Sequence, residues 1–177
     1  MTALGILVMG LNGCGKSTLG RALAERLGFR FMDAEDYYFP AEQDKPYAVS
    51  RTREEALSML RADVRRYPRF VYASVSGPQD EEVEARAALA VVLSAPKAVR
   101  MARIESRAIA RFGQRVQAGG DMFAQQRAFY AFAAKRSGDE VEARAARLAC
   151  AVLRLDGVRP IEENAAAAAA VYAELRG

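Results

Sequence analysis

The sequence predicts a three-layer α/β/α domain built on a five-stranded parallel sheet. Five apolar runs of strand length alternate with segments of helical periodicity, which is the order expected when helices cover both faces of a parallel sheet. A glycine-rich motif directly follows the first run, and the carboxyl ends of strands are where such sheets bind ligands. The chain has 177 residues and no linker-like block rich in Pro, Gly and Ser, so residues 1–177 are expected to form a single domain.

Composition narrows the classes of partner and compartment. The 26 Lys and Arg residues against 22 Asp and Glu residues give a net charge of +4, which does not by itself indicate nucleic acid. The two cysteines form no disulfide framework and suit a reducing cytosol, and the N-terminus lacks the basic segment of a signal peptide. No apolar run approaches membrane-spanning length, so we expect a cytoplasmic protein without a membrane partner. Because the chain has no histidine, a metal site must use oxygen ligands, which favours Mg²⁺ over zinc.

The first strand is predicted over residues 4–9 and the first helix over residues 17–27. The run GLNGCGKS between them fits G-x-x-x-x-G-K-[ST] without substitution, the phosphate-binding motif of P-loop NTPases. Its glycines let backbone N–H groups turn toward the phosphates, Lys16 reaches the β- and γ-phosphates, and the Ser17 hydroxyl is placed to bind Mg²⁺. A glycine turn that merely joins the two elements would need the whole pattern to arise by coincidence. The residues predicted to bind ATP here are Gly10, Asn12, Gly13, Cys14, Gly15, Lys16, Ser17 and Thr18.

A second strand is predicted over residues 29–32, and three carboxylates follow it within four residues. Asp33, Glu35 and Asp36 would repel one another unless a cation or a basic substrate group compensates their charge. We expect them to face the phosphate loop, because parallel strands end at the same edge of a sheet. The alternative is an acidic turn that caps the next helix.

Residues 34–68 form a long helical insertion between the second and third strands. A polar loop with two prolines is followed by a capping box from Thr52 to Glu55, which predicts the start of a helix. Arg51 and Arg53 stand at this helix start, where they could clamp an anion; the alternative is that both are ordinary surface arginines.

The third strand is predicted over residues 70–76 and the fourth over residues 89–94. Pro78 and Pro96 each suit the first turn of the helix that follows. Neither strand ends in an aspartate, although motor and GTPase classes of P-loop proteins hold magnesium with one there. In this chain the acid that most resembles that aspartate is Asp33, which follows the second strand.

A second insertion, residues 97–148, carries an arginine face. Arg100, Arg103, Arg107 and Arg111 are spaced three, four and four residues apart and therefore lie on one side of a helix. Like charges at this distance destabilise a helix unless an anion neutralises them, so we expect contact with phosphate; the alternative is a solvated face.

The remainder of the chain predicts two more helices before the last strand and one after it. An aromatic helix follows a Gly-Gly break, and its aromatic side chains are expected in the core rather than stacked on bases. A capping box is predicted from Ser137 to Glu140, a fifth strand over residues 149–155, and a final helix from Pro160. The aromatic residues are Phe123, Phe129, Tyr130 and Phe132.

The whole chain resembles the adenylate-kinase-like branch of P-loop kinases, which includes the nucleoside monophosphate, shikimate and gluconate kinases. Within that branch it is most similar to a set of bacterial proteins described as AAA-family ATPases or adenylate-kinase-like proteins. The resemblance implies that residues 34–68 bind the phosphoryl acceptor and that residues 97–148 contain a lid that closes over ATP. The stretches that carry it are GLNGCGKSTLGRALAERLG, FMDAEDYYF, RIESRAIARFG with GGDMF, and CAVLRLDGVRP.

The resemblance also implies roles for single residues. Asp33 matches the acid that orients the magnesium shell, and Glu35 or Asp36 lies where the acceptor hydroxyl or its base would be. Arg103 and Arg107 match paired lid arginines, one near the adenine and one near the transferred phosphate. The loop from Gly157 to Pro160, which includes Arg159, matches the loop that holds the adenine edge by backbone contacts.

Departures from the branch bear on the acceptor. The Thr-Gly-Asp stretch of adenylate kinases is replaced by residues 33–38, which argues against AMP, and the third strand lacks the glycines by which shikimate kinases hold the shikimate ring. Tyr37 and Tyr38 instead resemble the aromatic residue that follows the aspartate in nucleoside and uridine-type kinases.

The sequence therefore predicts an ATP-dependent phosphotransferase that moves the γ-phosphoryl group to a nucleoside, a nucleotide or a hydroxylated metabolite. Lys16, Arg107 and Arg111 would gather the negative charge of the transfer, and Asp36 or Glu35 would accept the proton. The predicted partner is a small-molecule acceptor; nucleic acid is not expected, and a homodimer is compatible with the sequence. The alternatives are a nucleotide-binding regulator or slow ATPase without a dedicated acceptor, and a polynucleotide end kinase. Predicted acceptor contacts are Asp33, Glu35, Asp36, Tyr37, Arg51 and Arg53; predicted metal ligands are Ser17 and Asp33; further nucleotide contacts are Arg103, Gly157 and Arg159.

Overall fold

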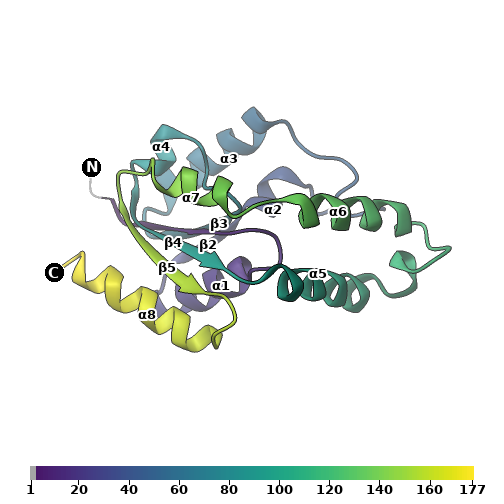
Figure 1. Cartoon of the computed structure of the whole chain (residues 1–177). Coiled ribbons are helices and arrows are strands. Elements are labelled where there is room, and N and C mark those ends of the chain that lie inside the picture. The colour runs from purple at the N-terminus through teal and green to yellow at the C-terminus, as the bar shows by residue number, and fades with distance from the viewer. Residues whose placement is uncertain (1–2) are drawn as a thin grey trace.

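The computed structural model describes residues 3–177 and confirms the predicted three-layer α/β/α fold (Figure 1). Its strands are β1 (Gly5–Met9), β2 (Arg30–Asp33), β3 (Phe70–Ser74), β4 (Ala87–Ser94) and β5 (Ala151–Asp156). They form one sheet in the order β2-β3-β1-β4-β5, and every neighbouring pair is parallel. All five carboxyl ends therefore meet at one edge, where the phosphate loop leaves β1.

The first strand forms the centre of the core. Ile6, Leu7, Val8 and Met9 have no exposed surface, because β1 lies between β3 and β4 and is covered on both faces by helices. Full burial of each such side chain contributes about 1.5–3 kcal/mol to folding. The loop that follows β1 is therefore anchored to the most buried part of the sheet.

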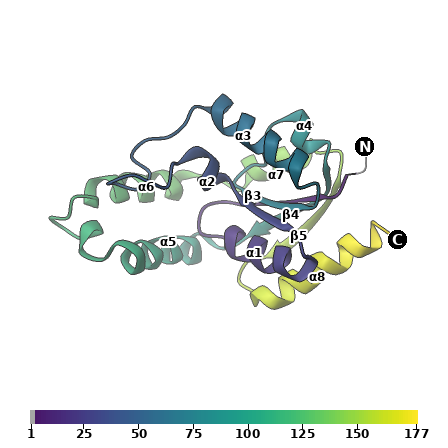
Figure 2. The same cartoon turned by 180° about the vertical axis from the view of Figure 1, so that it is seen from behind.

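Helices cover both faces of the sheet, as Figures 1 and 2 show from opposite sides. α1 (Lys16–Leu27) and α8 (Ile161–Glu174) pack side by side on one face, and α3 (Arg53–Arg66), α4 (Glu81–Glu84) and α7 (Asp139–Ala145) lie on the other. α2 (Ala34–Tyr38) directly follows β2. α5 (Lys97–Phe112), the short 3₁₀ helix η1 (Gly113–Val116) and α6 (Phe123–Lys135) extend past the carboxyl ends of the strands. We call this last group, residues 97–135, the arm. Within residues 3–177, none of the helices is long and apolar enough to span a membrane.

The capping box at the start of α3 is confirmed. The backbone N–H of Glu55 donates to the Thr52 hydroxyl at 3.3 Å, and the backbone N–H of Thr52 donates to the Glu55 carboxylate at 2.8 Å. Two N–H groups that have no partner within the helix are thereby satisfied, which sets where α3 begins.

One predicted helix start and one predicted capping box are wrong. α4 begins at Glu81 rather than at Pro78, because the Asp80 carboxylate caps it by accepting from the backbone N–H of Val83 at 3.1 Å. No capping box forms from Ser137 to Glu140: the side chain of Glu140 pairs with Arg136 at 2.7 Å instead of returning to the helix start.

The prediction that the aromatic residues of α6 lie in the core is wrong for two of them. Phe123 and Phe132 are 38% and 56% exposed, since the outer side of the arm has no further layer over it. Phe129 and Tyr130 pack against a small apolar cluster between α5 and α6, which holds the arm together.

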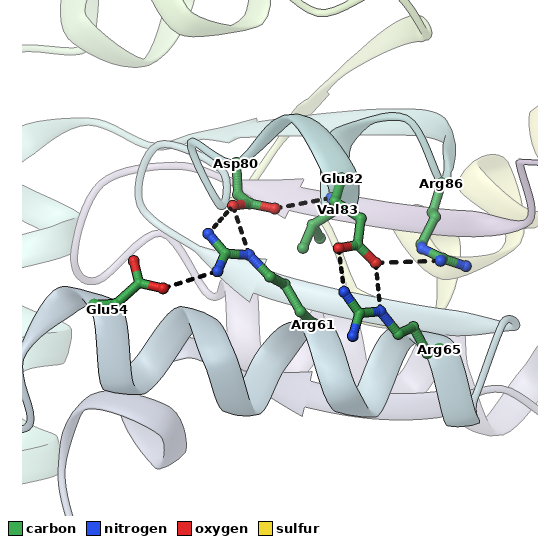
Figure 3. A network of polar contacts seen from close by, with 7 residues as sticks. All are labelled: Glu54, Arg61, Arg65, Asp80, Glu82, Val83 and Arg86. Atoms are coloured by element: carbon green, nitrogen blue, oxygen red, sulfur yellow. Dashed lines mark hydrogen bonds and ion pairs between the residues drawn. The ribbon is translucent and has the colours of Figure 1, made fainter.

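An ion-pair network joins α3 to α4 (Figure 3). Arg61 donates to the Asp80 carboxylate at 2.7 Å and 3.0 Å, and Arg65 forms a two-point pair with Glu82, which also pairs with Arg86. The guanidinium fork matches a carboxylate at two points and so defines the distance between the two helices.

Candidate active site

The phosphate loop has the backbone that its glycines predict. Gly13 and Gly15 adopt φ values of 85° and 99°, in the left-handed region that disfavours residues with a side chain. A Cβ on Gly13 would also lie 2.4 Å from the carbonyl oxygen of Arg100, so α5 packs directly on the loop. Gly15 is the N-cap of α1, which directs the positive end of that helix into the loop.

Lys16 points back across this loop. Its ammonium donates to the carbonyl oxygen of Leu11 at 3.3 Å. Burial lowers the pKa of Lys16, while the nearby Cys14, Asp33 and Glu35 oppose that effect. Lys16 is therefore a costly cation in the protein alone, and a bound anion would compensate its charge.

A cavity of about 760 Å³ opens above the loop. Its size lies within the range of about 300–1,000 Å³ typical of small-molecule sites. Its lining comes from the phosphate loop, the ends of β2 and β3, both insertions and the loop after β5. The predicted site residues in the lining are Asn12, Gly13, Gly15, Lys16, Ser17, Thr18, Asp33, Glu35, Arg103, Arg107, Arg111, Gly157 and Arg159.

Two of the three predicted carboxylates line this cavity. Asp33 is 7% exposed, and its Oδ1 accepts from the backbone N–H of Glu35 at 3.1 Å. Asp33 is thus the N-cap of α2 and a cavity residue at once, so the two alternatives drawn from the sequence are both realised. Asp36 is exposed and outside the lining; partial burial and the charge of Asp33 raise its pKa.

The arginine face of α5 turns toward the phosphate loop. Arg100 is 4% exposed and donates to the carbonyl oxygen of Asn12 at 3.1 Å. Arg103 donates to the carbonyl oxygens of Cys14 at 3.3 Å and Gly157 at 3.0 Å. Because these bonds tie α5 to the loop, the alternative of a wholly solvated face is wrong for its first two arginines.

Arg107 and Arg111 lie farther along α5 and line the cavity. The guanidinium of Arg107 is close enough to Lys16 to lower the pKa of that lysine. Three cationic groups, Lys16, Arg103 and Arg107, thus surround the space above the phosphate loop, which makes that space suitable for a polyphosphate.

Several predicted site residues do not reach the cavity. Tyr37 is buried and its hydroxyl donates to Asp63 at 2.7 Å, so the prediction that it contacts an acceptor directly is not supported. Arg51 donates to the carbonyl oxygen of Tyr37 at 3.0 Å and stabilises the backbone of α2. Gly10 and Cys14 belong to the loop but are packed toward the sheet: Cys14 is 2% exposed, and a Cβ on Gly10 would lie 2.3 Å from the carbonyl oxygen of Leu93 in β4.

Arg53 occupies a second, smaller cavity of about 170 Å³. Its guanidinium donates to the carbonyl oxygen of Gln79 at 2.7 Å. This cavity shares the lining residues Ala34, Ser74 and Val75 with the first, so the two spaces adjoin at the end of β3.

Sequence reasoning missed cavity residues on β3, on the loop after α2 and on α6. Ser74 ends β3, and its buried Oγ has no hydrogen-bond partner among the described residues. Its place at the carboxyl end of a strand beside β1 was a usable signal. Tyr47 and the side chains of α6 could not be found in this way, because only the packing of the arm brings them to the cavity. The missed residues include Phe39, Tyr47, Ser74, Met122, Gln125, Gln126 and Phe129.

The residues present fit a nucleotide and Mg²⁺. Gly13, Gly15 and Lys16 line the cavity at the N-terminus of α1, where backbone N–H groups without helical partners can donate to phosphate oxygens. Ser17 and Asp33 both line the cavity and supply one hydroxyl and one carboxylate. Mg²⁺ takes such a small oxygen set when substrate phosphates and water complete its shell.

Comparison with known proteins agrees with this geometry. Residues 6–115 match the protein family described as AAA domain. The chain belongs to this AAA-domain family. Across 90% of its length, this AAA-domain protein is 30% identical over 167 residues to the uncharacterized protein YqaC of Bacillus subtilis (strain 168), of which the match covers 92%. A stretch of 33 residues is 58% identical to the probable gluconokinase of Mus musculus, covering 19% of this chain and 18% of that one.

Solved structures of kinases share the fold of this AAA-domain protein. A gluconokinase from Sinorhizobium meliloti 1021 aligns with 99% of this chain and 95% of its own, with 19% identity and a TM-score of 0.54. The shikimate kinase from Acinetobacter baumannii in complex with shikimate aligns with 98% and 94%, with 20% identity and a TM-score of 0.57. The AAA-domain match and this shared fold support the predicted resemblance to the adenylate-kinase-like P-loop kinase superfamily.

Proposed function

We propose that this protein is an ATP-dependent phosphotransferase that moves the γ-phosphoryl group of ATP to a small-molecule acceptor. One observation carries the proposal: a single cavity contains the phosphate loop, two carboxylates and three lid arginines. Phosphoryl transfer requires this combination, because the protein contributes chiefly positioning and charge. The kinases that share its fold support a small molecule as the acceptor.

The cavity divides into a nucleotide side and an acceptor side. On the nucleotide side, the loop amides and Lys16 would hold the phosphates, and Arg103 with Gly157 would border the adenine. Ser17 and Asp33 would hold Mg²⁺, which neutralises phosphate charge when bound. On the acceptor side, Glu35 is the carboxylate best placed to orient a hydroxyl, since it lines the cavity whereas Asp36 does not.

The reaction breaks the bond between the γ-phosphorus and its bridging oxygen and forms a bond from that phosphorus to the acceptor oxygen. ADP leaves with the electron pair of the broken bond. The acceptor hydroxyl loses its proton late in the transfer, and Glu35 receives it. Lys16, Arg107 and Arg111 stabilise the charge that spreads over the transferred oxygens, and the arm keeps water from the site.

The second cavity suggests how the acceptor is anchored. Arg53 lines this cavity together with Ser74, which also lines the first, and its guanidinium would bind an anionic or hydroxylated end of the acceptor. The proposal keeps the predicted anion contact for Arg53 and gives Arg51 the role of supporting the backbone of α2.

The test is release of ADP from ATP, screened across nucleosides, nucleotides, sugars and hydroxy acids, with water alone as the control. A kinase releases ADP faster with one class of acceptor, and Lys16→Ala abolishes that release. Equal ADP release with and without every metabolite would indicate a slow ATPase or a regulator. Phosphorylation of oligonucleotide ends, with salt-dependent binding, would indicate a polynucleotide end kinase.

A further inference from the structure

The loop between α2 and α3 is fastened to the arm. Each of the four consecutive residues 44–47 makes one hydrogen bond to α5, α6 or the segment between them. Two of the bonds use backbone carbonyl oxygens of the loop and two use its side chains, so the contact depends on the path of the whole loop. The pairs are Asp44 O with Arg115 at 2.9 Å, Lys45 Nζ with Asp121 O at 3.3 Å, Pro46 O with Gln125 at 2.8 Å, and Tyr47 Oη with Arg111 at 2.6 Å.

Tyr47 connects this contact to the acceptor side of the cavity. Its hydroxyl accepts from Arg111 at 2.6 Å and donates to Oε2 of Glu35 at 3.1 Å. Burial raises the pKa of the hydroxyl, so it keeps its proton and can act as the donor to Glu35. The ring packs edge-to-face on Phe39 at 5.1 Å between centroids, which sets the direction of the hydroxyl.

The backbone at Tyr47 shows that its position is held by its surroundings. Its φ is +65°, in the left-handed region, where a bulky residue is rare. Such a conformation is strained and persists only when neighbouring contacts determine it. The bonds from residues 44–47 to the arm are those contacts, so release of the arm would free Tyr47 as well.

We propose that Tyr47 is a positioning residue that couples the arm to the acceptor carboxylate Glu35. Arg111 comes from the arm and Glu35 from α2, and one hydroxyl joins them. Movement of the arm onto a nucleotide therefore fixes the direction of Glu35 in the same step. The role of Glu35 in this inference rests on the proposed function; the link between the arm and residues 41–50 does not.

The test uses hydrogen exchange of the full-length protein with and without the non-hydrolysable analogue β,γ-imido-ATP and Mg²⁺. The variant Tyr47→Phe keeps the ring and removes the hydroxyl. The control Tyr130→Phe makes the same change on α6, outside the cavity lining. In the wild type and the control we expect the analogue to slow exchange over residues 41–50 by about tenfold, the effect of hydrogen bonds to charged groups. In Tyr47→Phe the phosphate loop stays protected while residues 41–50 lose this protection.

A second variant and a second readout keep the test decisive. Arg111→Gln breaks the same link from the arm and should uncouple residues 41–50 in the same way. Where the analogue protects the phosphate loop, equal protection of residues 41–50 in wild type and both variants, or no protection of these residues in the wild type, would overturn the coupling. If the analogue fails to protect the phosphate loop, the proposed function fails. The link is then judged without nucleotide: Tyr47→Phe should exchange faster over residues 41–50 and 113–125 together, and unchanged exchange there would overturn it.

With a phosphoryl acceptor in hand, Tyr47→Phe should raise the acceptor KM with little change in the Kd for nucleotide.

Discussion

The guanidinium of Arg103 donates to the carbonyl oxygen of Gly157 at 3.0 Å, so the arm and the loop after β5 meet beside the cavity, on the side that we propose for the nucleotide. The same guanidinium donates to Cys14 in the phosphate loop. One side chain thus joins the three segments that would surround the nucleotide. Gly157 must be a glycine for this contact, since a Cβ there would lie 2.6 Å from the carbonyl oxygen of Cys14.

We predict that Arg103→Ala weakens ATP binding about tenfold, because it removes a cation and the hydrogen bonds that hold the two loops together. Arg103→Lys should recover only part of this loss, since an ammonium is a point charge that cannot bond a phosphate at two points as a guanidinium does. Isothermal titration calorimetry with ATP and Mg²⁺ measures the change. Arg147→Ala, an exposed arginine outside the cavity lining, is the matched control. Wild-type affinity in Arg103→Ala would contradict the assignment of this side of the cavity to the nucleotide.

Lys16 gives a prediction in which stability and binding move in opposite directions. Burial holds its pKa below the ordinary value, so the unfolded chain binds this proton more readily than the folded protein does. The stability of the folded protein therefore increases as the pH rises from the pKa of Lys16 in the folded protein to its pKa in the unfolded chain. At neutral pH the protonated ammonium of Lys16 lowers this stability.

We expect Lys16→Met to raise the Tm of the ligand-free protein at pH 7 by about 2 °C and to abolish stabilisation by ATP. Thermal denaturation with and without ATP and Mg²⁺ provides both readouts. Lys135→Met, an exposed change at the end of α6, should leave both nearly unchanged. A variant at position 16 that is still stabilised by ATP would remove the central assignment of the phosphate loop.

Two neighbouring carboxylates, Glu35 and Asp36, are the candidates for the base that accepts the proton of the acceptor. Both are exposed, but Glu35 lines the cavity and contacts Tyr47, whereas Asp36 lies outside the lining. We expect Glu35→Gln to reduce kcat about 100-fold or more with ATP affinity unchanged, and Asp36→Asn to have a much smaller effect. Steady-state kinetics with the acceptor found by the screen, together with the Kd for ATP, measures both. The reverse order of effects would move the base to Asp36.

The sequence predicted those features of the fold and the site that depend on residues close together in the chain. The phosphate loop, the five strands and the cap of α3 depend on neighbours within a few residues, and each was recognised from local pattern. Asp33 was placed correctly in the cavity because the end of a parallel strand has a known location. Tyr47 could not be predicted, since its partners Glu35 and Arg111 lie 12 and 64 positions away and meet only after the arm has folded over the loop. The false start at Pro78 has a different origin: the cap of Asp80 on Val83 is local, and the proline signal was followed instead of it.

The network between α3 and α4 predicts a pH-dependent stability that is separate from the site. Hydrogen bonds from Arg65, together with Arg86, lower the pKa of Glu82 from 4.5 to about 2. A carboxyl group with a depressed pKa stabilises the folded protein above its unfolded pKa, and this contribution disappears as the pH falls through the folded value.

Glu82→Gln should therefore lower the Tm at pH 7 by about 2 °C, a small effect because the pair is exposed to solvent. The difference from wild type should shrink between pH 4.5 and pH 2, whereas Glu81→Gln, an exposed change on the same helix, should show no such dependence. Thermal denaturation across this pH range checks it; a difference that stays constant down to pH 2 would show that Glu82 acts through packing, not charge.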